Sequence, residues 1–576
     1  MSPIQSDSAL SLRSPLLTWS YLASWVADRR TDFYQASLPY IGFTLWFILA
    51  WLVGDFYLNV PAGIEIFRVE YPLTLYLFFV INQITHASPW RPILGLVAIF
   101  GLYVIHDVYW LSFNDIPSLI MIQEVPELFL VGDWKLKGIL LGIPVMVLFF
   151  FIYWVRYTLR SLLVVLPLLI LPGLMFTNPA VLVNTIEWGV AWIYPWVRVD
   201  NATFNGRFTV ALYDEAKRRV AMEKLAGYGN NPIQAEYFQQ LVSYLKAHRQ
   251  EDRHIFVLVM ESFLDARLLK PLRGRNEIID AEFRRSYDKS WGFSISPTFA
   301  GGTARAEFEI LCGVPALAEF DDVEFNLFTG NPVPCVPEVL SQIGYDSIAN
   351  YPYHPSFFNA QRAYAGFGFQ QAYFAAEYTN RPTYLHLDQK DQYLFDGSFF
   401  QQNRDFLSQT TRDKPIFNYL LTLYGHMYFE VQRPIRWKIE IKDPYLERIV
   451  NIGYYRSAAL AEEIKWITEH YPKSLIIAIA DHLPILQNDL ETYAQLDYLH
   501  TVKDFGYYNR ILIVQDGKPK KLPTLHHFGV PDIIYDYLTN GDYCRDFQCV
   551  TRYPYDKEQL RERYRYLLAH AAQPAS

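Results

Sequence analysis

Long apolar stretches without a charged residue are the feature that most constrains this chain. Four of them lie in its first third, at residues 33–54, 71–90, 138–155 and 161–186. Each is long enough to cross roughly 30 Å of hydrocarbon as a helix. A fifth stretch, 92–111, carries His106 and Asp107 near its end, and such groups are costly in lipid unless they lie close to an interface. The sequence therefore predicts about five membrane-spanning helices over residues 33–186.

Charge is distributed unevenly along the chain. Among the first 200 residues 23 are charged, against 87 of the remaining 376, so the second part has the composition of a water-soluble domain. The overall composition excludes a disordered, collagen-like or coiled-coil chain. The formal net charge of −8 offers no basic surface, which argues against nucleic acid as a partner.

Basic residues next to the predicted spans indicate the orientation in the membrane. The segments assigned to the cytoplasmic side contain Arg13, Arg29, Arg30, Arg91, Arg156 and Arg160. The opposite loops contain Asp115, Glu124, Glu127 and Asp133. This bias predicts a cytoplasmic N-terminal segment, 1–32, and an extracytoplasmic location for everything after about residue 177. No small-residue cleavage site follows the first apolar run, so we expect no removable signal peptide.

All four cysteines fall in the part assigned to the outside, where an oxidising compartment allows two disulfides. Three connectivities are possible. The short-loop choice pairs Cys312 with Cys335 and Cys544 with Cys549. Zinc ligation is the competing interpretation, but no C-x-x-C spacing supports it.

Residues 187–250 are expected to connect the two parts. The stretch 180–199 mixes Trp188, Trp192, Tyr194 and Trp196 with aliphatic residues. This pattern fits a helix in the headgroup region, and equally a core helix of the second domain. The polar patterns at 214–224 and 235–248 predict connecting helices.

Strand-like apolar runs recur in the last part, 251–576. They lie at 254–260, 416–423, 474–480 and 509–514, with helical patterns such as 456–470 between them. This alternation predicts an α/β sandwich with a mostly parallel, buried sheet. Because ligands bind at the carboxyl ends of the strands in such sheets, the residues that follow each run are the candidates for chemistry.

Two of these runs are followed by groups that bind metals. Glu261 ends the first run, and Asp481 and His482 end the third. Each of them alone would fit a turn or a helix cap. Together, directly after buried strands, they predict a site for a divalent cation.

Thr303 follows the pair Gly301-Gly302 and precedes a helical pattern. Thr is common as an N-cap at such a point. The alternative is a nucleophile whose alkoxide is stabilised by the helix dipole and a bound metal, beside glycines that let a phosphate approach the backbone. Local sequence leaves both interpretations open.

Four motifs in this order are similar to those of a known family. They are MESF at 260–263, GGTARAEFEILCGVP at 301–315, YGHMYFE at 424–430 and ADHLP at 480–484. With the five spans in front, the chain resembles the lipoteichoic acid synthase and phosphoglycerol transferase family, which is a sulfatase-like branch of the alkaline phosphatase superfamily. The resemblance implies a metal, manganese first and magnesium or zinc next, held by Glu261, Thr303, Asp481 and His482.

The resemblance also implies the reaction. Thr303 would take a phospho-group from a phospholipid, leaving diacylglycerol, and pass it to an acceptor hydroxyl of an extracytoplasmic glycan or polysaccharide. His426 matches the family's substrate-side histidine. The implied location is a bacterial inner (cytoplasmic) membrane, with the catalytic domain on the periplasmic side.

One stretch departs from the family pattern. The family lines its glycerol phosphate pocket with a tryptophan and, two residues later, an arginine, but Phe358 and Ala360 stand at these positions in the best gapless alignment. Arg362 and His354 are the candidates for the missing positive donor. Arg305 is a further candidate phosphate ligand, or else an exposed helix arginine. The head group is therefore open between phosphoglycerol, the first choice, and phosphoethanolamine.

Two other functions remain open at this stage. One is hydrolysis by a phosphodiesterase or sulfatase on the same fold, although a sulfatase needs a Cys or Ser in a C/S-x-P-x-R setting, which TARA at 303–306 lacks. The other is an inactive partner of a polysaccharide export system. The pair His526-His527 lies near the site entrance by resemblance, but paired loop histidines are more often simply solvated.

Overall fold

The computed structural model describes most of the chain. The described residues are 37–52, 64–86, 90–113, 134–190, 202, 204–321, 323–355, 357–378, 393–409, 414–426, 438–486, 489–499 and 502–574. The N-terminal segment 1–32, Trp192, Tyr194, Trp196 and the end of the YGHMYFE motif lie outside them. The chain divides into two units, Met1–Lys217 and Arg218–Ser576.

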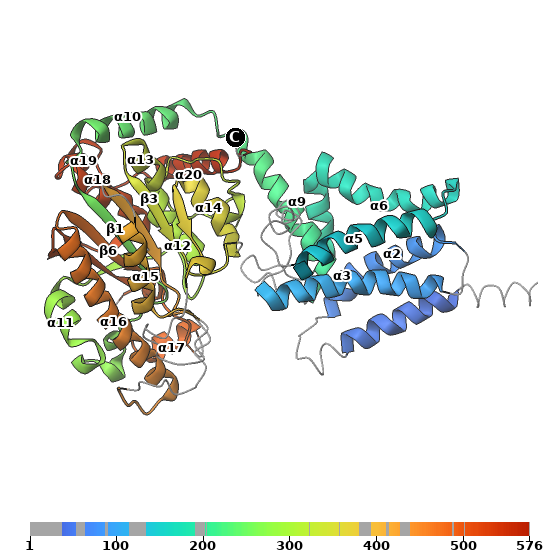
Figure 1. The fold of residues 1–576 in the computed structure, drawn as a ribbon, viewed down its shortest axis with the longest axis horizontal. Helices are drawn as coiled ribbons and strands as arrows, with labels where there is room; N and C mark the ends of the chain where they lie inside the picture. The colour runs from blue at the N-terminus through green and yellow to red at the C-terminus, as the bar shows by residue number, and fades with distance from the viewer. Residues whose placement is uncertain are drawn as a thin grey trace, which may run out of the picture. The chain divides into compact units, whose positions relative to one another are not determined.

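The first unit is helical over its described part (Figure 1). A helix covers Ser37–Leu52. The α-helices that follow it in this unit are α2 (Glu70–Ile84), α3 (Arg91–Phe113), α5 (Trp134–Tyr153), α6 (Leu159–Thr177), α7 (Pro179–Gly189) and the start of α9 (Arg207–Leu225). Each of the five predicted spans therefore contains a helix. The part of 180–199 that is described is the helix α7, on which Trp188 is 92% exposed.

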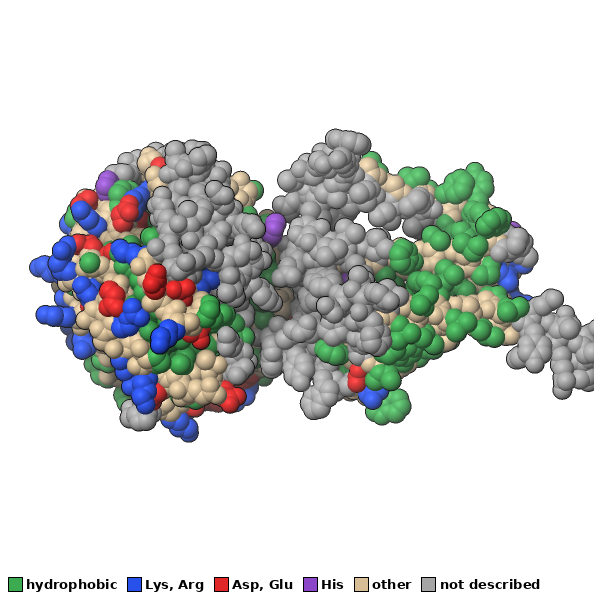
Figure 2. Space-filling model, turned by 90° about the horizontal axis from the view of Figure 1, so that it is seen from below, with side chains coloured by type: hydrophobic (Ala, Val, Ile, Leu, Met, Phe, Trp, Pro, Cys, Tyr) green, Lys and Arg blue, Asp and Glu red, His purple; other side chains and the backbone are tan. Residues whose placement is uncertain are grey.

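One described helix is both long and apolar enough to cross a membrane. It is Leu159–Thr177. An 18-residue stretch of this helix has a mean hydropathy of 2.2 and is 11% buried. The helix Ser37–Leu52 and the part Arg91–Tyr103 of α3 are shorter apolar segments. Hydrophobic side chains gather on the surface of this unit, whereas charged side chains are spread over the other (Figure 2). The domain of five spans remains a prediction.

Glu70, at the start of α2, holds the start of α9 within the first unit. Its buried carboxylate accepts hydrogen bonds from Tyr103 Oη at 2.6 Å and from the backbone N–H and the hydroxyl of Thr209 at 2.9 and 2.8 Å. The first N–H groups of a helix have no partner inside the helix, so a carboxylate at that end satisfies them and complements the helix dipole.

A nine-stranded mixed sheet forms the centre of the second unit. Its order is β4-β3-β5-β1-β6-β7-β2-β9, with β8 paired to β7. The strands are β1 (His254–Met260), β2 (Gly292–Ile295), β3 (Asp346–Asn350), β4 (Gln371–Tyr373), β5 (Ile416–Leu421), β6 (Ser474–Ala480), β7 (Tyr508–Gln515), β8 (Lys518–Lys520) and β9 (Leu525–His526). The central pairs β5-β1 and β1-β6 are parallel, whereas β7 runs antiparallel to β6 and β2. The predicted strands and the mostly parallel sheet are confirmed.

Alternate residues of the buried strands face two different cores. In β1, Val257 and Val259 belong to one core cluster and Phe256 and Leu258 to the other. This is the period of two expected of a strand covered on both faces. The sheet is thus the middle layer of three (Figure 1).

The helices that cover the sheet divide between the two cores. One layer contains α10 (Pro232–His248), α12 (Thr303–Cys312), α13 (Val336–Gln342), α14 (Ala360–Phe367), α18 (Val530–Leu538), α19 (Asp542–Asp546) and α20 (Lys557–Ala571). The other contains α11 (Ala281–Tyr287), α15 (Asp396–Gln409), α16 (Pro444–His470) and α17 (Asp489–Gln495). The predicted helical patterns at 214–224, 235–248 and 456–470 lie in α9, α10 and α16.

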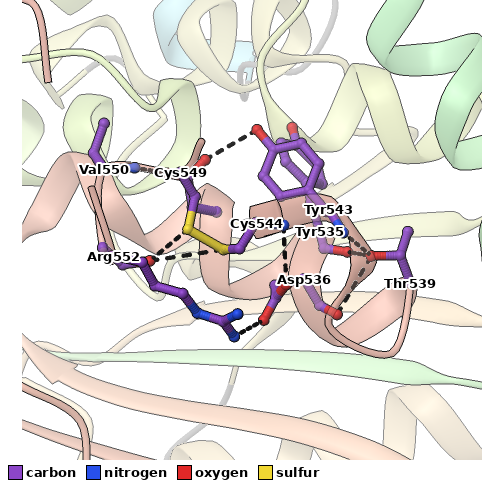
Figure 3. The surroundings of a disulfide bond; sticks show 10 residues. Tyr535, Asp536, Thr539, Tyr543, Cys544, Cys549, Val550 and Arg552 are labelled. Carbon is purple, nitrogen blue, oxygen red and sulfur yellow. Dashed lines mark hydrogen bonds and ion pairs between the residues drawn. A yellow bond between two sulfur atoms is a disulfide. The ribbon is translucent and has the colours of Figure 1, made fainter. Parts of the chain in front are cut away.

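Two disulfides close short loops in the second unit. They join Cys312 to Cys335 and Cys544 to Cys549, so the short-loop pairing is confirmed and the cysteines do not ligate zinc. The second disulfide lies beside α18 (Figure 3). There Asp536 accepts from the backbone N–H of Cys544 at 3.1 Å and pairs with Arg552. The disulfide and the carboxylate together hold the loop after α19 against α18.

Candidate active site

The parallel pairing of β1 and β6 brings the predicted acidic residues together. Met260 lies opposite Ala480 in the register, so the residues that follow, Glu261 and Asp481, leave the sheet side by side. The backbone N–H of Ser262 donates to Asp481 Oδ1 at 2.8 Å and thereby joins the two strand ends. The neighbour-strand geometry expected from the sequence is present.

Glu261, Thr303, Asp481 and His482 form one cluster, which we call the metal-ligand cluster. Thr303 Oγ1 lies 3.0 Å from Glu261 Oε2 and 3.3 Å from His482 Nε2. His482 Nε2 lies 3.2 Å from Asp481 Oδ2 and 3.7 Å from Glu261 Oε1. The two carboxylates and the imidazole are at most 2% exposed, whereas Thr303 is partly exposed. The carboxylates and the imidazole are thus buried, and Thr303 is the partly exposed member of the cluster.

Thr303 reaches the cluster because the helix α12 starts there. Gly301 and Gly302 have φ values of 144° and 73°, which strain any residue with a Cβ. Gly302 occupies the N-cap position, and Thr303 is the first helical residue. Its hydroxyl donates to Glu261 instead of capping the helix, so the N-cap interpretation of Thr303 is wrong.

The donor atoms of the metal-ligand cluster fit a divalent cation. Atoms of Glu261, Asp481 and His482 lie within 4.8 Å of one another. Asp481 Oδ2 is fully buried and accepts no hydrogen bond from the described residues, with His482 Nε2 only in ion-pair contact at 3.2 Å, although a buried carboxylate oxygen normally accepts one. A cation would satisfy this oxygen. Carboxylates with an imidazole suit manganese, magnesium or zinc.

Neighbouring charges govern protonation in the cluster. Burial raises the pKa of Asp481 to about 7, and the negative charge of Glu261 acts in the same direction. Burial also opposes ionisation of Glu261, but the nearby His482 and His426 hold the pKa of this carboxyl below its ordinary value. Burial disfavours the charged form of His482, but the two carboxylates raise its pKa. The site thus stabilises positive charge between Glu261 and Asp481, as a cation would require.

His426 lies five residues beyond the end of β5, the strand on the other side of β1. Its Nδ1 is 3.3 Å from the hydroxyl of Tyr393, and the two rings are 5.3 Å apart. His426 is also one of the two histidines whose charge lowers the pKa of Glu261. The structure therefore brings His426 to the same edge of the sheet as the metal-ligand cluster.

The candidate residues His354, Phe358 and Arg362 lie beyond β3, around the start of α14. The ring of Tyr353 contacts His354 edge-on and Tyr393 at a tilt, with ring centroids 5.1 and 6.0 Å apart, and so links this region to His426 through Tyr393. Phe358 has a left-handed backbone with φ 52° and packs against Phe357. His354, Phe358 and Arg362 are partly exposed.

Arg305 is on α12 but points to a different group. Its Nη2 donates to the carbonyl of Ala316 at 3.0 Å. Burial raises the pKa of Glu309 and of Glu324, and the nearby charge of Arg305 partly opposes that rise. The guanidinium is therefore engaged at the loop after α12. Arg305 is partly buried, so it is not the exposed helix arginine of the alternative interpretation.

The pair His526-His527 is not a solvated loop. His527 is fully buried, and its Nε2 lies 3.1 Å from Ser294 Oγ on β2. Burial lowers the pKa of His527 to about 3, so the imidazole is neutral. His526 stacks on Phe528. The expectation of two solvated histidines is wrong for His527, because the turn that follows β9 places its ring beside Ser294 of β2.

Sequence reasoning missed two contributors to the site. Ser262 Oγ donates to Glu261 Oε1 at 2.7 Å and lies 3.4 Å from His482 Nδ1. Its place directly after Glu261 was the available signal. Tyr393 stands at the edge of a segment without regular periodicity, so nothing in the sequence linked it to His426.

Comparison with protein families places a known domain over this site. Residues 253–535, just under half of the chain, match the family model described as Sulfatase. This range contains every residue of the metal-ligand cluster. The second unit thus has a sulfatase-like fold.

Two curated proteins resemble part of the chain. One is described as a candidate cyclic beta-1,2-glucan modification protein of Rhizobium meliloti, 26% identical over 254 residues, which are 42% of this chain and 37% of that protein. The other is the lipoteichoic acid synthase of Staphylococcus saprophyticus, 25% identical over 250 residues, which are 41% and 36%. The match spans little more than a third of each relative. The resemblance to this family is confirmed.

Solved structures give a more distant likeness. The Listeria monocytogenes lipoteichoic acid synthase LtaP has 16% identity and a TM-score of 0.41, with 52% of this chain and 77% of that chain covered. The Streptococcus pyogenes phosphoglycerol transferase GacH, in complex with sn-glycerol-1-phosphate, has 15% identity and a TM-score of 0.42, with 61% and 92% covered.

Proposed function

We propose that this chain, with its sulfatase-like domain, is a membrane-anchored, metal-dependent phosphotransferase that moves a phosphoglycerol head group from a phospholipid to an extracytoplasmic glycan. The covalent intermediate is a phosphodiester on Thr303. The observation that carries the proposal is the position of the Thr303 hydroxyl, which donates to Glu261 at 3.0 Å inside a cluster suited to a cation.

The residues that would hold the cation are Glu261, Thr303, Asp481 and His482. A divalent cation bound there supplies positive charge that favours the Thr303 alkoxide and offsets the charge on the transferring phosphoryl oxygens. The N-terminus of α12 acts in the same direction, because the helix dipole is positive at this end and Gly302 has no side chain to cap it.

Transfer takes two displacements. In the first, Thr303 Oγ1 gives its proton to solvent and bonds to phosphorus, and the bond from phosphorus to the diacylglycerol oxygen breaks. In the second, an acceptor hydroxyl bonds to phosphorus, the bond to Thr303 breaks, and Oγ1 takes a proton back from solvent. His426, across the site, is the proposed group that gives a proton to the diacylglycerol oxygen and takes one from the acceptor.

The donor and the acceptor are inferred from the relatives and from the residues near His426. A lipoteichoic acid synthase and a glucan modification protein among the relatives support a glycan or polysaccharide acceptor. His354 and Arg362 are the proposed positive donors for the head-group phosphate, with Phe358 beside them. Arg305 is a weaker proposal, because it is engaged with Ala316. Phosphoethanolamine is the alternative head group.

Anchoring by about five helices would bring the site to the lipid donor. The proposed domains are a cytoplasmic segment 1–32, a membrane domain 33–186, a connector 187–250 and a catalytic domain 251–576 on the periplasmic face of the inner membrane. Two disulfides support an oxidising compartment for the catalytic domain.

The test uses the full chain in detergent with Mn²⁺, phosphatidylglycerol or phosphatidylethanolamine, and a soluble β-glucan. We expect diacylglycerol release to depend on Mn²⁺ and on phosphatidylglycerol, with the glycerol phosphate recovered on the glucan. Diacylglycerol release with free glycerol phosphate at every glucan concentration would instead show a phosphodiesterase. Release from phosphatidylethanolamine alone would identify the alternative head group.

A further inference from the structure

Arg456 is a fully buried arginine in the middle of α16. It is 1% exposed, and its guanidinium makes three directed contacts. Nε donates to Asp396 Oδ2 at 2.6 Å, Nη1 to the carbonyl oxygen of Glu261 at 2.7 Å and Nη2 to Thr422 Oγ1 at 3.0 Å. An ion pair with Asp396 of α15 thus holds the guanidinium, and the other two contacts of the guanidinium reach the ends of β1 and β5.

Glu261 is held at both backbone atoms by this arrangement. Its N–H donates to Thr422 Oγ1 at 3.2 Å, while its carbonyl accepts from Arg456. Thr422 is itself fixed, because its N–H donates to the carbonyl of Val259 at 2.9 Å. The peptide that carries the Glu261 carboxylate therefore has little freedom to turn.

Gly425 packs directly against the same contact. A Cβ at this position would lie 2.1 Å from both Arg456 Nη1 and the carbonyl oxygen of Glu261, so no other residue fits without a shift. The next residue is His426. The guanidinium therefore fixes the turn before His426 as well as Glu261.

A second ion pair, in which the carboxylate is buried and the arginine is partly exposed, joins the same two helices without reaching the strand ends. Arg404 on α15 contacts Glu463 on α16 at 2.7 Å, and Glu463 is 1% exposed. Burying an ion pair is costly and a hydrophobic pair would often join helices as well. A role beyond joining α15 to α16 is therefore needed for Arg456, and its contacts with Glu261 and Thr422 provide one.

We propose that Arg456, fixed by Asp396, is a positioning residue that sets the Glu261 carboxylate and the turn before His426 in place for metal and substrate binding. The inference rests on the proposed function, because it takes Glu261 as a metal ligand. Groups of this kind, one shell away from the ligands, typically change metal affinity by roughly 10- to 100-fold.

The test compares Arg456→Gln with the matched variant Arg404→Gln in the full chain, purified in detergent. Free Mn²⁺ is titrated against each protein by electron paramagnetic resonance, and the melting temperature is measured in chelator. We expect the Mn²⁺ dissociation constant of Arg456→Gln to rise roughly 10- to 100-fold. Arg404→Gln should keep the wild-type value, even where it lowers the melting temperature equally.

Thr422 supplies a second pair of variants if Arg456→Gln does not fold. Thr422→Val removes the hydroxyl that links Arg456 to Glu261, and we expect weaker Mn²⁺ binding; Thr422→Ser keeps the hydroxyl and should restore it. Wild-type affinity in Arg456→Gln or Thr422→Val, or an equal loss in Arg404→Gln, would overturn the positioning role alone. Absence of Mn²⁺ binding by the wild-type chain would overturn the proposed metal site itself.

Discussion

Two buried carboxyl groups on α12 differ in protonation from the carboxyl group of Glu261. Glu307, one turn after Thr303, accepts from the hydroxyls of Tyr364 and Tyr419 at 2.7 and 2.8 Å, and burial raises its pKa to about 8. Glu309 is buried on the same helix and accepts from the N–H of Ala316 at 3.0 Å. These groups keep a proton near neutral pH, unlike Glu261, the proposed metal ligand, whose pKa is lowered by the nearby His482 and His426.

The first prediction concerns the pH dependence of stability through Glu309. Burial, with the nearby charge of Glu324, raises the pKa of Glu309 from 4.5 to about 8. Between these pH values the folded chain keeps the proton that the unfolded chain has lost, so stability falls as pH rises through this window. The slope of the free energy of unfolding reaches about 1.4 kcal/mol per pH unit for one such group.

Glu309→Gln should flatten that slope. Denaturant unfolding of the second unit at several pH values between 5 and 8, in chelator, measures it for both proteins. Identical slopes in the wild type and the variant would show that Glu309 does not keep its proton in the folded chain.

At the scale of residues, sequence patterns identified groups whose position follows from a strand end. Glu261, Asp481 and His482 each come directly after a buried strand, so the topology alone brings them together. Arg456 and Tyr393 gave no such signal, because a helix interior and an aperiodic segment do not reveal which side chain turns inward. His527 was misjudged because the two-residue strand β9 is too short to recognise in a sequence.

At the scale of elements, the site depends on how β1, β5 and β6 end. Three parallel strands finish at one edge, and α12 begins beside them at Thr303. The sequence predicted these strands from continuous apolar runs. It did not predict that β7 is antiparallel, because a run of buried residues looks the same in either direction.

The close approach at Gly425 leads to a prediction for the end of β5. Gly425→Ala should cost about 1–3 kcal/mol of stability, as overpacking in a tight site does, and should weaken Mn²⁺ binding by displacing Glu261. Gly453→Ala in α16 is the control, since its nearest neighbour would be the carbonyl of Leu264 at an ordinary 3.7 Å. Denaturant unfolding and Mn²⁺ titration check both. An alanine at 425 without effect would contradict the packing described.

The two disulfides should contribute unequally to stability. They close loops with sequence separations of 23 and 5 residues. The loop-entropy model gives about 3 kcal/mol for the Cys312–Cys335 bridge and about 2 kcal/mol for Cys544–Cys549. Serine replacement of each pair, followed by denaturant unfolding, measures both losses. A larger loss for Cys544→Ser with Cys549→Ser would mean that native contacts around Asp536 outweigh loop entropy.

At the scale of the whole molecule, the two units have different surfaces. Charged residues are sparse before residue 200 and common after it, and the described surfaces follow this division (Figure 2). Composition alone predicted this division. Composition does not fix the number of spans in the same way, because an apolar helix such as Ser37–Leu52 is shorter than a helix that crosses a membrane.

The proposed orientation predicts where reporters are active. Fluorescent protein fused to the N-terminus should fluoresce, as it does in the cytoplasm, and alkaline phosphatase fused to the C-terminus should be active, as it is outside. An odd number of spans puts the two termini on opposite sides, and the basic residues beside the spans put the N-terminus in the cytoplasm. Both termini on the same side of the membrane would rule out five spans.

The central claim is that Thr303 carries the transferred group. The most direct measurement is the intact mass of the full chain after incubation with Mn²⁺ and phosphatidylglycerol or phosphatidylethanolamine, alongside Thr303→Ala. We expect a mass gain of one glycerophosphoryl group with phosphatidylglycerol, localised to Thr303 by fragmentation and absent from Thr303→Ala. An unmodified wild-type chain that still releases diacylglycerol, or an adduct that persists in Thr303→Ala, would contradict it.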